Sequence, residues 1–221
     1  YLAILLVNQI FNKTKQKSVK PKRHNMKKIT LILALLFTTS FSKSFVVNDK
    51  LKWTYLNETF NTISKKNISI FYDTESDIFH LSFKSPISDI RFIFKTSDDY
   101  DLRHSIEKYK EWNKKASAKK VKITKAINQV DVPKAYFSQF NKWHTGFGSM
   151  KYLFNSHSTQ THHLGILGKL QSDSNQFSTT EIWIILTYSE ANALHKALSP
   201  KSLSAYKIKA KKLENELVEF N

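Results

Sequence analysis

Apolar and polar positions alternate along much of the chain after residue 45, and this pattern predicts β-strands. In the first half we expect four strands, at Leu51–Leu56, Asn67–Tyr72, Ile78–Lys84 and Asp89–Lys95. In the second half we expect four more, at Ala135–Phe140, Met150–Asn155, His162–Leu170 and Glu181–Thr187. The segment Thr145–Gly148 (TGFG) holds two of the chain's four glycines, so we expect it to form the turn between the first two strands of the second half.

Each set of strands is followed by apolar residues spaced three and four apart, which predicts amphipathic helices. The first such face is formed by Leu102, Ile106, Tyr109, Trp112 and Ala116. A second helix is expected to begin near Ser189, and Pro200 predicts a new helical N-terminus because proline suits the first helical position. The expected fold class is therefore α+β, with two related halves of about four antiparallel strands, each followed by an amphipathic helix, in the order β4-α-β4-α.

The two predicted halves also share sequence features at a constant offset. Ile90–Phe94 aligns with Ile182–Leu186, and Leu102 aligns with Leu194, which we expect to be equivalent core positions. We therefore expect one domain over residues 45–221, made of two repeats at about 45–130 and 131–221. The order β4-α-β4-α resembles that of single-strand-binding folds of the Whirly type, which pair two such units. The resemblance is one of topology, with no matching binding motif, so it implies no function.

The segment Met26–Ser44 has the order of a secretory signal peptide. Lys27 and Lys28 precede the apolar run Ile29–Phe37, and small residues follow at Ser42 and Ser44. We expect cleavage after Ser42 or Ser44 and a periplasmic or secreted protein; retention as an anchor is the alternative. Residues 1–25 are expected to be upstream sequence, or otherwise a long n-region or a first anchor. No later apolar run is long enough to span a membrane, so we expect no membrane-spanning segment once the signal is cleaved.

About half of the net positive charge of the chain lies in residues 1–45. The formal net charge is +17, but the part after residue 45 has 26 basic and 18 acidic residues, a balance of +8. Only Arg91 and Arg103 supply guanidinium groups there, and forked contacts to phosphates or guanine favour Arg over Lys. We therefore expect no specific nucleic-acid recognition. Cysteine is absent, so disulfides do not stabilise the fold.

Histidines are the best candidates for chemistry, because the chain has no Cys, no GxSxG or SxxK nucleophile motif, and no phosphate-binding glycine loop. His144, His157 and His163 are predicted to line a polar cleft between the halves. Neighbouring strand residues such as His162 and His163 point to opposite faces and cannot ligate one ion together. We therefore predict no metal, no cofactor and no catalytic residue; a hydrolase-type enzyme using the histidine cleft is the alternative.

A lysine run from residue 108 to residue 125 is interrupted by the single acid Glu111. By helical spacing one face of this run is formed by Lys108, Lys115, Lys119 and Lys122. Such a face could bind an anionic polymer such as nucleic acid or lipopolysaccharide, or it could be a solvated helix surface. The leading hypothesis remains a non-enzymatic binding or interaction module, whose partner would be another envelope protein or an anionic surface.

Overall fold

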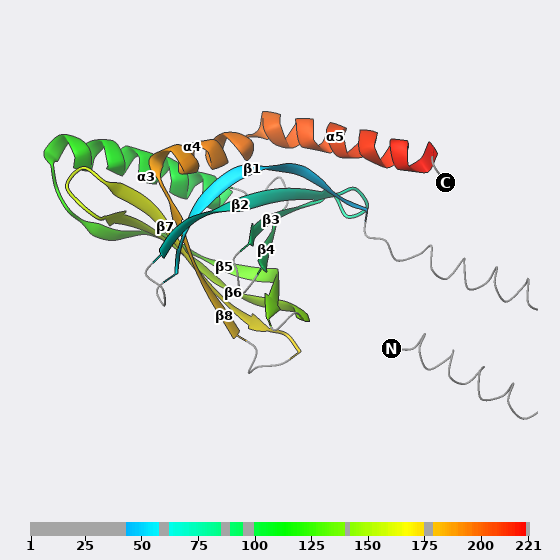
Figure 1. Cartoon of the computed structure of the whole chain (residues 1–221), viewed down its shortest axis with the longest axis horizontal. Helices are drawn as coiled ribbons and strands as arrows, with labels where there is room; N and C mark the ends of the chain where they lie inside the picture. Colours follow the sequence, from blue (N-terminus) through cyan, green and yellow to red (C-terminus); the bar gives the residue numbers. More distant parts are fainter. Residues whose placement is uncertain are drawn as a thin grey trace, which may run out of the picture. The chain divides into compact units, whose positions relative to one another are not determined.

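The computed structural model describes residues 43–57, 62–84, 89–94, 100–139, 142–174 and 179–219. These residues form eight strands and three helices (Figure 1). The first four strands are β1 (Ser44–Asn57), β2 (Thr62–Asp73), β3 (Ile78–Lys84) and β4 (Asp89–Phe94). After helix α3 (Tyr100–Lys119) come β5 (Thr124–Gln139), β6 (Lys142–Ser156), β7 (His162–Ser172) and β8 (Thr179–Leu186). The chain then forms helices α4 (Tyr188–Ala197) and α5 (Pro200–Glu219).

The eight strands form one closed antiparallel sheet in which each strand pairs with its neighbours in sequence. Strand β4 pairs directly with β5, through Ile90 opposite Phe137, although α3 separates them in the chain. The sheet closes where Thr54 of β1 pairs with Ile185 of β8. The prediction of two related halves, each of four strands followed by a helix, is therefore wrong. Its boundary at residue 130 falls inside β5, and the sheet is continuous across it.

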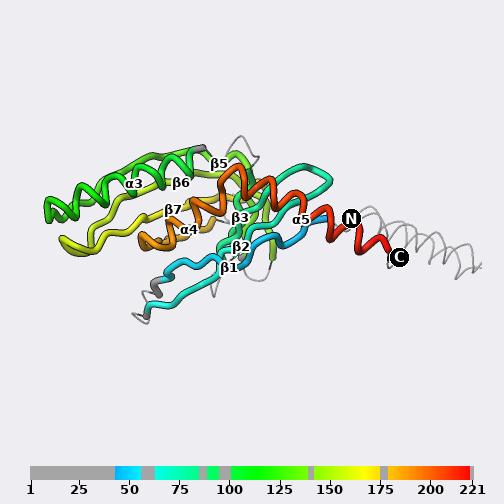
Figure 2. The backbone as a smooth tube through the Cα atoms, turned by 90° about the horizontal axis from the view of Figure 1, so that it is seen from above, coloured from blue at the N-terminus to red at the C-terminus, as the bar shows by residue number. Residues whose placement is uncertain are grey.

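All three helices lie on one side of the curved sheet (Figures 1 and 2). Helix α3 contacts β5, β6 and β7, while α4 contacts β1, β7 and β8. Helix α5 continues from α4 and contacts β1 and β2. Alternate strand residues point to the helices and form the core, whose largest buried side chains include Trp53, Phe79, Phe83, Phe137 and Phe154.

Specific hydrogen bonds fix the helices to the sheet. The buried hydroxyl of Tyr109 in α3 donates to the backbone oxygen of His162 at 2.9 Å, so this helix is anchored on β7. The amide of Asn48 in β1 donates to the hydroxyl of Tyr206 in α5 at 2.6 Å. Lys43 pairs with Glu214 of α5 at 3.0 Å, which ties the first described residue to the last helix. These contacts make the helices part of the folded core.

The glycine-rich segment Thr145–Gly148 lies inside β6, so the prediction that it forms a turn is wrong. A Cβ atom on Gly148 would lie 1.9 Å from the backbone oxygen of Lys169, and one on Gly146 would lie 2.2 Å from that of Gln171. Glycine is needed here because strands β6 and β7 approach too closely for any side chain.

The starts of the last two helices follow capping rules. Helix α4 begins after Thr187, whose hydroxyl accepts from the backbone of Glu190, and the Glu190 carboxylate accepts from the backbone of Thr187 at 2.8 Å. This capping box places Ser189 inside the helix, one position after its first residue. Helix α5 begins at Pro200, as the sequence predicts.

The two aligned leucines differ in environment. Leu194 in α4 is fully buried at 0% exposure, whereas Leu102 in α3 is only half-buried and borders a cavity. The predicted equivalence of these positions therefore does not extend to their packing.

The proposed signal segment up to Ser42 lies outside the described residues.

Candidate functional site

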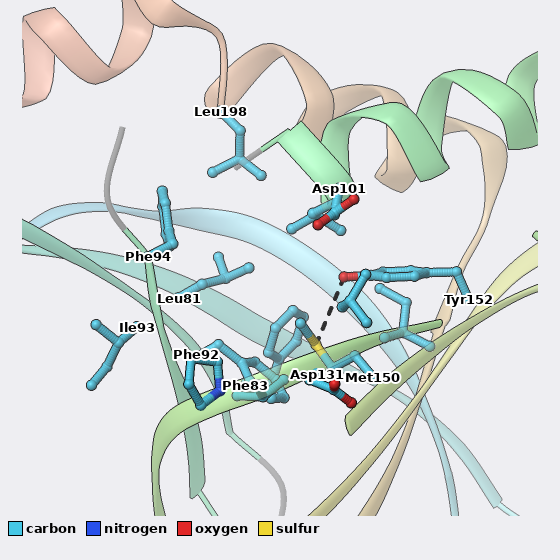
Figure 3. Close-up of a pocket in the computed structure, with 15 residues that line it drawn as sticks. Leu81, Phe83, Phe92, Ile93, Phe94, Asp101, Asp131, Met150, Tyr152 and Leu198 are labelled. Carbon is cyan, nitrogen blue, oxygen red and sulfur yellow. Dashed lines mark hydrogen bonds between the residues drawn. The ribbon is translucent and has the colours of Figure 1, made fainter. Parts of the chain in front are cut away.

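A cavity of about 460 Å³ opens between the sheet and the first turn of α3 (Figure 3). Its floor comes from β3 and β4, its wall from β5, β6 and β7, and its upper edge from α3 and from the residue that ends α4. The lining is largely apolar: Leu81, Phe83, Phe92, Ile93, Phe94, Leu102, Val130, Val132, Pro133, Met150, Ile166 and Leu198, joined by Asp101, Asp131 and Tyr152. Its volume lies within the roughly 300–1,000 Å³ of small-molecule sites.

An irregularity in β5 shapes the wall of this cavity. The register of β5 against β6 shifts between Val132 and Ala135, so the strand carries a bulge there. Pro133 lies within the bulge, where its missing N–H costs no ladder hydrogen bond. The register is regular up to Val132, so Val130 and Val132 face the cavity while the exposed side chain of Asp131 lies on the opposite face of β5.

Tyr152 places one polar group inside the apolar chamber. Figure 3 shows its hydroxyl directed toward the sulphur of Met150, at 3.9 Å, which is a weak acceptor. Burial raises the pKa of the Tyr152 hydroxyl, and the nearby Asp101 carboxylate raises it further. The hydroxyl therefore stays protonated at neutral pH and is a donor whose partner is weak.

Two acidic residues lie at the edge of this space. Asp101 lies in the first turn of α3, and Asp131 lies on β5; both side chains are exposed (Figure 3). Among the residues that the structure describes, those that line the cavity include no Lys, Arg or His. The described lining of the cavity is therefore mainly apolar, with its charged residues at the exposed edge. The sequence contains one indication of the cavity, namely Asp131 and Pro133, which interrupt the apolar positions of β5.

The lysine face is only partly retained in the structure. Lys108, Lys115 and Lys119 lie on α3, but Lys122 lies beyond its end. Lys115 and Lys119 instead border a second, smaller cleft of about 240 Å³ together with Lys125 of β5. The floor of this cleft includes Trp112 and Phe154, and the ammonium groups of Lys125 and Lys108 lie 5.1 and 5.8 Å from the Trp112 ring centroid. Sequence spacing alone had missed the contribution of Lys125 from the adjoining strand.

The structure does not bring the three predicted cleft histidines together. His144 stacks on Phe137 with ring centroids 5.3 Å apart, near the start of β6. His157 is exposed in the turn after β6, and the half-buried His163 follows on β7, opposite Asn155. Asn155 lies eleven positions after His144 in β6, a distance of roughly 35 Å along the strand.

A different histidine forms a close polar pair. The buried Ser156 hydroxyl lies 2.8 Å from Nδ1 of His162, which is itself buried at 4% exposure. Burial lowers the pKa of His162, so the neutral imidazole is favoured. Nucleophilic catalysis needs a reachable serine, and this one lies on the buried face of β6, outside the lining of the cavity and of the smaller cleft. The pair is best explained as a hydrogen bond within the core, although the buried Nε2 of His162 has no hydrogen-bond partner in the described structure.

Within the described ranges, no cluster of three or more His, Cys, Asp or Glu side chains is placed to hold a metal ion. Among those residues, no helix combines the length and apolar character that crossing a membrane would require. Searches against family models, curated proteins and solved structures found no match to this chain.

Proposed function

We propose that this protein is a non-enzymatic binding module that holds a small, largely apolar molecule in the cavity between α3 and the sheet. The observation that carries the proposal is a cavity of about 460 Å³ whose described lining has twelve apolar residues and one inward-directed hydroxyl. Protein interiors are close-packed, and unfilled apolar volume costs roughly 24 cal/mol per Å³. A space of this size is therefore better explained by a ligand that occupies it than by imperfect packing.

The wall of the cavity offers a matched pair of variants for a test. Val130 borders the cavity, while the adjacent Gln129 is exposed on the other side of β5. Val130→Trp should fill part of the chamber, whereas Gln129→Trp adds the same indole on the same strand outside it. Binding of the uncharged fluorophore N-phenyl-1-naphthylamine is measured by titration. We expect the wild type and Gln129→Trp to bind it in the micromolar range and Val130→Trp to bind at least tenfold more weakly.

Equal affinity in all three proteins would place the fluorophore elsewhere, and the cavity proposal would be wrong. Circular dichroism and the urea midpoint show whether Val130→Trp is folded. Leu102→Phe, from the opposite side of the chamber, is a second filling variant.

The smaller lysine-bordered cleft supports a second candidate function, weak binding of anionic amphiphiles such as lipopolysaccharide. Three ammonium groups surround an apolar floor there, and Val121 and Ile123 beside it are 41% and 43% exposed. Counterion release would make such binding fall steeply with salt. Replacing Lys115, Lys119 and Lys125 with Gln should weaken lipopolysaccharide binding at low salt more than the single change Lys122→Gln does. If each lysine removed weakens lipopolysaccharide binding by the same amount, the binding depends on the overall positive charge and not on the cleft.

Export to the periplasm or medium is proposed on the order of residues from Met26 to Ser44. Cleavage after Ser42 is favoured over cleavage after Ser44 by the contacts of Lys43. Its ammonium pairs with Glu214, and its backbone oxygen accepts from the backbone of Thr74 at 3.2 Å. Cleavage after Ser44 would remove both contacts.

A further inference from the structure

We infer that the cavity binds apolar ligands that carry an uncharged hydrogen-bond acceptor, such as the carbonyl oxygen of a ketone or an ester, and that Tyr152 donates to this acceptor. This inference rests on the proposed function of the cavity and adds the chemical class of its ligand. The observation that carries it is a fully buried tyrosine in the lining, whose hydroxyl has a thioether sulphur as its one hydrogen-bond contact in the described structure.

The position of Tyr152 leaves its hydroxyl poorly satisfied. The side chain is 0% exposed, and its oxygen lies 3.9 Å from the sulphur of Met150 (Figure 3). A thioether is a weak acceptor, whereas most buried hydroxyls in proteins have a good hydrogen-bond partner. Burial raises the pKa of Tyr152, so the hydroxyl keeps its proton at neutral pH. A carbonyl oxygen on a ligand would therefore accept a hydrogen bond for which the protein itself offers only sulphur.

Met150 makes this hydroxyl reachable for a ligand. Met150 and Tyr152 are two positions apart on β6, so their side chains lie on the same face of the sheet, and both line the cavity. Met150 is only half-buried. Its unbranched side chain has three rotatable bonds and adapts readily to a changed space. The sulphur can therefore turn aside and leave its position next to the hydroxyl to the acceptor of the ligand.

The rest of the lining restricts the polar group of the ligand. Among the described residues that line the cavity, Tyr152 is accompanied by no Ser, Thr, Asn, Gln or Trp and by no basic side chain. An ionised group on the ligand would lose its water without gaining an opposite charge, which costs far more than the transfer of an uncharged carbonyl. A ketone, ester or ether oxygen needs only one donor, and Tyr152 supplies it.

The test compares two ligands of the same shape. Acetophenone and α-methylstyrene differ only in that the carbonyl oxygen of the first is a CH₂ group in the second. Each displaces N-phenyl-1-naphthylamine from the full-length protein at pH 7. In Tyr152→Phe we expect the affinity for acetophenone, relative to that for α-methylstyrene, to fall about fivefold, the usual effect of losing one uncharged hydrogen bond. The control Tyr136→Phe removes a half-buried hydroxyl from β5 outside the cavity lining and should keep the wild-type ratio.

The infrared spectrum of bound acetophenone gives a readout that a purely structural role of Tyr152 would not change. A hydrogen bond weakens the C=O bond, so the carbonyl band should lie at lower frequency in the wild type and in Tyr136→Phe than in Tyr152→Phe. In the wild type the band should also lie below that of acetophenone in hexane, a comparison that needs no variant to fold. A wild-type band at the hexane position would overturn the inference.

The outcomes separate this inference from the proposed function of the cavity. If the fluorophore binds in a way that Val130→Trp weakens, but Tyr152→Phe keeps the wild-type ratio of the two ligands, the acceptor inference is overturned and the cavity function stands. If the fluorophore does not bind, or binds equally well to Val130→Trp, the cavity function fails and the inference fails with it.

Discussion

Truncating the two aligned leucines, Leu194→Ala and Leu102→Ala, should have clearly unequal effects on stability. Leu194 is fully buried against the core, so truncation removes three buried carbons worth about 2.4 kcal/mol at roughly 0.8 kcal/mol each. The residual void adds to this cost, which should bring the total to about 3–4 kcal/mol. Leu102 is half-buried and borders a space that is already unfilled, so its truncation should cost only about 1 kcal/mol.

Urea unfolding of the purified variants, followed by circular dichroism, measures this difference. With a slope of about 2 kcal/mol per molar urea, the midpoint should fall by about 1.5–2 M for Leu194→Ala and by about 0.5 M for Leu102→Ala. The slope should stay constant, so that the midpoints report stability alone. Equal shifts of the two midpoints would refute the argument, because they would mean that Leu102 is packed as a core residue and that no cavity lies beside it.

Three further predictions follow from other parts of the fold. Gly148→Ala should cost roughly 1–3 kcal/mol, since its Cβ would lie 1.9 Å from a β7 carbonyl oxygen, whereas Gly165→Ala, with 3.6 Å to its nearest neighbour, should cost less than half as much in the same urea assay. Burial lowers the pKa of His162 below the unfolded value near 6.5, so its contribution to stability is present above pH 6.5 and is lost as the pH falls. His162→Asn should therefore lose less stability between pH 7.5 and pH 5 than the wild type. An equal loss would contradict the claim that His162 is buried in its neutral form. Mass spectrometry of the protein expressed from Met26 and recovered from the periplasm should show cleavage after Ser42. Cleavage after Ser44 would contradict the structural role of Lys43, which contacts Glu214 and Thr74. An intact N-terminus would favour a membrane anchor.

The hydrophobic pattern located the elements but not their pairing. The predicted strand Ile78–Lys84 coincides with β3, and the spacing of Leu102 to Ala116 falls within α3. A period of two reports which residues face the core, but it carries no information on which strand lies alongside. The pairing of β4 with β5 across a twenty-residue helix, and of β1 with β8, therefore could not be derived, and the apparent repeat suggested separate halves instead.

The cavity was hidden from sequence analysis for a physical reason. Residues such as Phe92 and Ile166 are apolar and point inward, as core residues do, and only the three-dimensional arrangement shows that they leave space between them. The histidines were more conspicuous because of their chemistry, yet β6 holds His144 far from His163. Strand β5 was predicted only from Ala135 onward because Asp131 and Pro133 interrupt its alternation, and those same residues border the cavity.

Methyl chemical-shift mapping tests most directly the claim that the cavity is the binding site. The protein, labelled at Ile, Leu and Val methyl groups, is titrated with N-phenyl-1-naphthylamine. The account predicts the largest shifts at Leu81, Leu102 and Val130, which border the cavity, with little change at Val121 and Ile123 in the lysine-bordered cleft. Saturable shifts confined to Val121 and Ile123, or no saturable shifts anywhere, would contradict it.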